Sequence, residues 1–97
     1  MNQKEVMQFR KAVQEAVNKA DLYFLIEGGA PLDEYDSCVD NIVSILINQK
    51  PSHEQLYLKL CEIFKNEDFG LPLPDRKEIV DLADELLELY GNLIKHQ

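Results

Sequence analysis

Acidic side chains gather in one part of this chain, and they are its best candidates for binding a ligand or a partner. Between residues 20 and 49 the sequence has no Lys or Arg. The acidic residues of the same stretch are Asp21, Glu27, Asp33, Glu34, Asp36 and Asp40. These six residues account for most of the net charge of −8. Five of them form a candidate interaction surface: Glu27, Asp33, Glu34, Asp36 and Asp40.

Three of these residues have the spacing of one helical face. Asp33, Asp36 and Asp40 lie three and four positions apart, so their carboxylates would point the same way from a helix. Grouped carboxylates can bind a hard cation, although the Asp-x-Asp-x-Asp-Gly series of an EF-hand loop does not occur. A structural role is favoured, because acids in the first turn of a helix interact with its positive end. A contact surface for another protein comes second, and a metal site third.

The chain offers little with which to build a catalytic site. Its histidines are His53, in the predicted first turn of a helix, and His96, near the C-terminus, and neither has an evident Ser or Cys companion. We interpret His53, beside Glu54, as a solvated residue rather than a general base. Carboxylate pairs such as Asp36 and Asp40 are common on exposed helices. We therefore predict a protein that is not an enzyme, with no catalytic residue, no cofactor site and no metal ligand.

The acidic segment begins with a turn whose residues have structural explanations. We expect Gly28 or Gly29 to close a short helical turn in a left-handed conformation. Pro31 would bend the chain, Asp33 would cap the next helix, and Tyr35 would anchor that helix in the core. The two glycines are not a phosphate loop, because no Lys-Ser or Lys-Thr follows them and their surroundings are acidic.

Apolar periodicity and capping signals predict an all-α protein of about four helices. Three pairs place a capping side chain three residues before Glu or Gln: Asn2 with Glu5, Ser52 with Gln55, and Asp75 with Glu78. The helices are expected at residues 3–19, 33–48, 52–66 and 76–94, with the short helical turn at 22–26. The segment 67–74 is rich in Gly and Pro and should be a loop. Residues 1–97 would form a single helical domain, an orthogonal array or a bundle.

The last predicted helix has a wide apolar surface. Its main stripe consists of Ile79, Leu82, Ala83, Leu86, Tyr90 and Leu93. Val80, Leu87 and Ile94 add an edge at a spacing of seven. We place this helix at the centre of the array, and keep as the alternative a homodimer through that edge. The same helix carries a second acidic stripe, which consists of Glu78, Asp81, Glu85 and Glu88. We interpret it as a solvated face, and as a further binding platform if the partner is basic.

The net charge also argues against some classes of partner. A charge of −8, with the basic residues scattered along the chain, disfavours nucleic acid and an anionic membrane surface. A basic protein partner is compatible with it. No apolar run approaches the roughly 20 residues of a membrane span, and the N-terminus has the features of neither a signal peptide nor a transit peptide. We expect a cytoplasmic protein in which Cys38 and Cys61 are reduced and buried.

The segment Asp21-Leu-Tyr-Phe-Leu-Ile-Glu-Gly-Gly-Ala-Pro-Leu-Asp-Glu-Tyr-Asp36 resembles the YugE-like family, small bacterial proteins classed as a domain of unknown function. The resemblance covers about residues 4 to 69, and its specific part is Gly29 to Asp36. Family members have Asp-Pro where this chain has Asp21-Leu22. The resemblance implies an all-α fold of about four helices and no particular activity.

Two classes of function follow as hypotheses. The leading one is a non-enzymatic cytoplasmic module that binds another protein through an acidic surface. A sharper form of it is an immunity- or antitoxin-like protein that neutralises a basic toxin. The alternative is a domain that binds a metal or a small ligand through the acidic cluster at residues 27–40.

Overall fold

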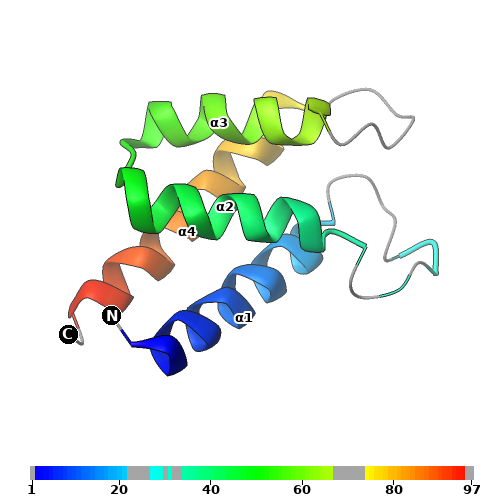
Figure 1. The fold of residues 1–97 in the computed structure, drawn as a ribbon. Coiled ribbons are helices and arrows are strands. Elements are labelled where there is room, and N and C mark those ends of the chain that lie inside the picture. Colours follow the sequence, from blue (N-terminus) through cyan, green and yellow to red (C-terminus); the bar gives the residue numbers. More distant parts are fainter. Residues whose placement is uncertain (1, 22–26, 30, 32–33, 67–73, 96–97) are drawn as a thin grey trace.

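Four helices account for most of the part of the chain that the structure describes. The computed structural model describes residues 2–21, 27–29, 31, 34–66 and 74–95. The helices are α1 (Gln3–Ala20), α2 (Asp36–Gln49), α3 (His53–Asn66) and α4 (Arg76–Lys95). The predicted all-α fold with four helices is confirmed (Figure 1). The expected helical turn at 22–26 lies outside the described residues.

The start of the second helix differs from its prediction. We expected it near Asp33, with that residue as the cap, but α2 begins at Asp36 and its N-cap position is Tyr35. Tyr35 makes no side-chain capping bond there. The prediction that Asp33 caps this helix is therefore wrong, because Tyr35 occupies the N-cap position; Asp33 itself lies outside the described residues. Asp36 now occupies the first turn, where its charge interacts with the positive end of the helix.

Capping side chains explain where two of the other helices begin. The Glu5 amide donates to Asn2 Oδ1 at 2.8 Å. At α3 the capping box is reciprocal, because the Ser52 amide donates to Gln55 Oε1 at 2.9 Å and the Gln55 amide donates to Ser52 Oγ at 3.3 Å. Helix α4 begins directly after Asp75, as the sequence indicates.

The four helices form a closed ring in which each helix packs against two others. Helix α1 lies against α2 and α4, and α3 lies against the same two helices. Figure 1 shows α2 and α3 side by side, with α4 crossing behind them. The wide apolar stripe of α4 contacts two main neighbours, α1 and α3, as its width predicted, although α4 forms one side of the ring and is not enclosed at its centre.

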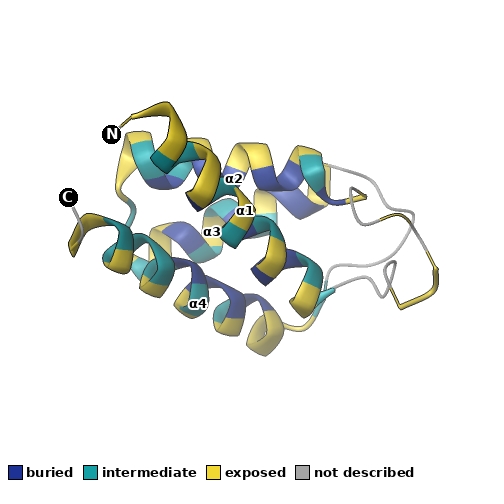
Figure 2. Ribbon diagram, turned by 90° about the horizontal axis from the view of Figure 1, so that it is seen from below, coloured by how far each residue is buried: buried dark blue, intermediate teal, exposed yellow. Residues whose placement is uncertain are grey.

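The core lies inside this ring, and every helix contributes to it. Figure 2 shows the buried faces turned inward. The largest fully buried side chains include Tyr35, Phe64, Ile42, Leu46, Leu56, Leu60, Ile79, Leu82 and Leu86. The radius of gyration is 12.9 Å, close to the roughly 13 Å expected for a domain of this length. Cys38 is buried as predicted, whereas Cys61 is only half-buried.

The predicted subunit edge on α4 is only partly free. Leu87 packs against the core, and Val80 is half-buried. Ile94 is 48% exposed. Among the described residues, no helix is both long and apolar enough to cross a membrane.

Candidate functional site

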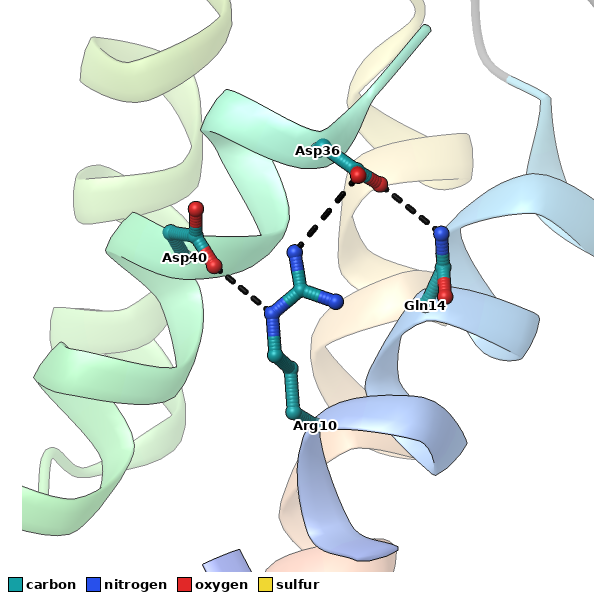
Figure 3. Close-up of polar contacts among 4 residues, drawn as sticks. All are labelled: Arg10, Gln14, Asp36 and Asp40. Carbon is teal, nitrogen blue, oxygen red and sulfur yellow. Dashed lines mark hydrogen bonds and ion pairs between the residues drawn. The ribbon is translucent and has the colours of Figure 1, made fainter. Parts of the chain in front are cut away.

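Asp36 and Asp40 share one cation from the neighbouring helix. Arg10 on α1 donates from Nε to Asp40 Oδ1 at 2.7 Å, and its Nη2 lies 3.7 Å from Asp36 Oδ2 (Figure 3). Gln14, one turn further along α1, donates from Nε2 to Asp36 Oδ1 at 2.8 Å. The prediction that Asp36 and Asp40 lie on one helical face is confirmed, and that face is turned toward α1.

This cluster mainly joins α1 to α2. The hydrogen bond to Asp40 raises the pKa of Arg10 above its ordinary value, and the nearby charge of Asp36 acts in the same direction. The Arg10 side chain is 33% exposed and that of Asp40 is 64% exposed, so water screens the pair. A pair of this exposure contributes at most about 1 kcal/mol to stability.

The same geometry bears on the metal hypothesis. A hard cation would need several oxygens converging on one point, but the Arg10 guanidinium already lies between the two carboxylates. Within the described part of the chain, no group of three or more His, Cys, Asp or Glu side chains is arranged to hold a metal ion.

Asp21 holds the base of the acidic turn. Its Oδ1 accepts a hydrogen bond from the Tyr35 hydroxyl at 2.7 Å, and its Oδ2 accepts one from the Glu27 amide at 2.8 Å. Asp21 also ends α1, because its own amide donates to Val17 O at 2.9 Å while its backbone is left-handed, with φ 42°. Tyr35 is only 1% exposed, which confirms its predicted anchoring role.

The turn itself places polar groups in solvent. Gly29 has φ +97°, so a positive φ is confirmed for one of the two candidate glycines, and open space surrounds it. The Glu34 amide donates to Pro31 O at 3.1 Å, which tightens the chain ahead of α2. Gly28 and Gly29 are exposed, as are Pro31, Glu27 and Glu34. Of the candidate interaction surface, Glu27 and Glu34 are thus exposed on the turn, Asp36 and Asp40 contact Arg10, and Asp33 is outside the described residues.

The second acidic stripe lies along α4 next to the end of α1. Lys19 Nζ is 3.5 Å from Glu85 Oε1. Glu78, Asp81 and Glu88 are exposed, as expected for a solvated face.

His53 has a partner that the sequence did not reveal. Its Nε2 lies 2.6 Å from Asp84 Oδ1 on α4, although the two groups are not aligned as a hydrogen bond. The side chains are 42% and 63% exposed. His53 is thus partly exposed in the first turn of α3, and it also contacts a carboxylate across the α3–α4 interface. A His–carboxylate contact does not by itself supply a nucleophile.

A second contact between α3 and α4 involves Tyr57. The Arg76 guanidinium carbon lies 5.3 Å from the centre of the Tyr57 ring, a cation–π geometry worth about 0.5–1 kcal/mol at an exposed site. The hydrogen bond between Tyr57 and Cys61 raises the pKa of the Tyr57 hydroxyl above its ordinary value, and the charge of Arg76 opposes that shift.

Arg10, Asp21 and Asp84 are the site residues that sequence reasoning missed. The sequence did hint at Arg10, because it lies beside the apolar stripe of α1 and four residues before Gln14. Comparison of the chain with models of protein families, with curated proteins and with solved structures finds no match.

Proposed function

We propose that the protein is a non-enzymatic interaction module of the cytoplasm that binds a basic protein through exposed carboxylates. The observation that carries the proposal is the exposure of Glu27 and Glu34 on a turn whose base is fixed by Asp21. A surface of one sign speeds association with a partner of the opposite sign.

An immunity- or antitoxin-like role is the sharper form of this proposal. Such a protein would cover the basic surface of a toxin. The acidic composition supports it, since 18 Asp and Glu stand against 10 Lys and Arg. The resemblance to the YugE-like family adds no activity to this proposal.

Charge reversal on the turn tests the proposal. The immobilised protein is used to capture partners from a lysate of the cells that make it, at about 0.05 M and about 0.5 M salt, because salt screens exposed charges. We expect one main basic protein to be retained at low salt and released at high salt. The variant Glu27→Lys/Glu34→Lys should retain much less of it.

A matched control separates this surface from net charge alone. Glu54→Lys/Glu62→Lys makes the same charge change on exposed positions of α3. Asp36 and Asp40 are poor choices for reversal, because their loss would also disturb the contact with Arg10. Equal capture by the turn variant and the wild type would overturn the role of the turn.

A further inference from the structure

Two hollows lie along the interface of α1 and α4, and together they are called the α1–α4 groove. The hollow near the start of α1 has a volume of about 520 Å³ and is lined by Phe9, Ala12, Leu89 and Leu93, with Glu5, Gln8 and Asn92 at its margins. The floor of this hollow is apolar, since Phe9 is almost fully buried and both leucines pack against the core. Figure 2 views the molecule from below and shows α1 and α4 next to each other.

A second, acidic hollow lies further along the same interface. It has a volume of about 240 Å³ and is lined by Lys19, Ala20, Leu82 and three carboxylates, those of Glu78, Asp81 and Glu85. The residue numbers run in opposite directions along α1 and α4, so the two helices are antiparallel. The two hollows therefore lie one after the other along their interface.

Helical spacing places both hollows on one side of the helix pair. On α1, Gln8, Ala12 and Lys19 lie four and seven positions apart, which keeps them on one face. On α4, Asp81, Glu85 and Leu89 are four apart and share a face in the same way. The eleven steps along α1 from Gln8 to Lys19 correspond to a rise of about 16 Å.

The charges of the groove define its occupant. Four carboxylates line the two hollows, those of Glu5, Glu78, Asp81 and Glu85, against the single ammonium of Lys19. Glu78 and Asp81 are exposed and have no ion-pair partner among the described residues. A second copy of this chain is disfavoured, because it carries a net charge of −8.

We infer that the α1–α4 groove binds a basic amphipathic helix of a partner protein. Apolar side chains at helical spacing enter the hollow above Phe9, and Lys or Arg side chains reach Glu78 and Asp81. This is the helix-in-groove mode of recognition, in which side chains spaced by three and four residues act as anchors. The inference rests on the proposed binding of a basic partner, and it adds the groove as a second contact beside the turn.

A designed peptide tests the inference directly. The probe is a fluorescein-labelled helix of about 14 residues, long enough to span about 21 Å, with leucine on one face and lysine elsewhere. Its controls are a scrambled peptide of the same composition and a peptide with glutamate in place of lysine. Fluorescence anisotropy at physiological salt should show binding of the amphipathic peptide, binding at least about tenfold weaker for the scrambled one, and none for the acidic one.

Variants of the protein locate the contact. Asp81→Lys reverses a charge in the acidic hollow, and Ala12→Gln fills the apolar one with a residue that helices tolerate. Each should weaken binding of the peptide about fivefold to tenfold, as expected for one lost anchor. Glu62→Lys makes the same charge change on α3, away from the groove, and should change binding less than about twofold. Far-UV circular dichroism of each variant checks that it is folded.

The outcomes separate the groove from the general proposal. Equal binding of the amphipathic and scrambled peptides, or equal effects of Asp81→Lys and Glu62→Lys, would overturn the groove while leaving a basic partner in place. Loss of binding in Glu27→Lys/Glu34→Lys alone would assign the contact to the turn instead. Absence of binding by the amphipathic peptide would overturn the groove, and the capture experiment would then decide on the basic partner. Dimers in light scattering that Asp81→Lys or Ala12→Gln dissociates would show that the occupant is a second copy.

Discussion

Loss of the Asp21 carboxylate should destabilise the protein more than loss of any other exposed or half-exposed acid. Among the described residues, it accepts a hydrogen bond from the Tyr35 hydroxyl at 2.7 Å and one from the Glu27 amide at 2.8 Å. A hydrogen bond to a charged group contributes about 1.5–3 kcal/mol, and one to an exposed amide about 0.5–1 kcal/mol. The left-handed backbone, with φ 42°, adds about 1 kcal/mol against alanine. Asp21→Ala should therefore lower the free energy of unfolding by about 3–5 kcal/mol.

Conservative variants separate these contributions. Asp21→Asn keeps the tolerance for a left-handed backbone and one carbonyl oxygen for the Tyr35 hydroxyl, so it should cost only about 1 kcal/mol. Tyr35→Phe removes the hydroxyl from a side chain that is 1% exposed, and it should cost about 1.5 kcal/mol. For a domain of this size, 1 kcal/mol corresponds to a change in Tm of about 4–8 °C.

Urea denaturation followed by circular dichroism measures the coupling. In a double-mutant cycle, Asp21→Ala and Tyr35→Phe should show an interaction energy of about 1–2 kcal/mol, because each removes the same bond. An interaction energy below about 0.5 kcal/mol would refute the assignment of Asp21 as the residue that holds the turn. Equal losses for Asp21→Asn and Asp21→Ala would show that charge, and not backbone conformation or geometry, decides the effect.

Three further predictions concern the other contacts. Arg10→Ala should lower the free energy of unfolding by about 1 kcal/mol at low salt, and the difference from wild type should shrink at about 1 M salt; a difference that salt leaves unchanged would contradict an electrostatic role for the contact with Asp36 and Asp40. In Cys61→Ala, the tyrosine absorbance near 295 nm should titrate at lower pH, because the raised pKa of Tyr57 depends on Cys61. Since that pKa is raised in the folded state, its contribution to stability is present below the ordinary tyrosine pKa of about 10 and is lost as the pH rises above it; identical titrations of variant and wild type would disprove the Tyr57–Cys61 bond. Millimolar calcium, magnesium or manganese should leave Tm unchanged, because a guanidinium lies between the two α2 carboxylates; a rise in Tm that grows with metal concentration would support the alternative function.

Local patterns in the sequence were enough to predict the four helices and the caps of α1 and α3, although not the start of α2. The apolar period of 3.6 residues and the Ser52–Gln55 capping box depend on neighbours within four positions, so the sequence shows them directly. The positive φ of Gly29 follows from residue type in the same way. These features hold whatever the angle between the helices.

Contacts between helices could not be predicted in this way. Arg10 meets Asp40 thirty positions away, and His53 meets Asp84 on another helix. Such pairs depend on how far each helix is rotated and at what angle it crosses its neighbour, which a single sequence does not reveal. The same limit explains why the acidic residues between positions 20 and 49 had no evident partner in the sequence, although Arg10 contacts two of them, Asp36 and Asp40.

The ring arrangement has a consequence for the order in which the chain folds. Closing the ring joins its first and last helices: Lys19 and Glu85 are 66 positions apart, against 30 for Arg10 and Asp40. Each doubling of a closed loop costs about 0.6 kcal/mol more chain entropy, so the α1–α4 interface should form later than the α1–α2 interface. A partner that binds along the α1–α4 interface would hold the first and last helices together and slow the opening of the fold.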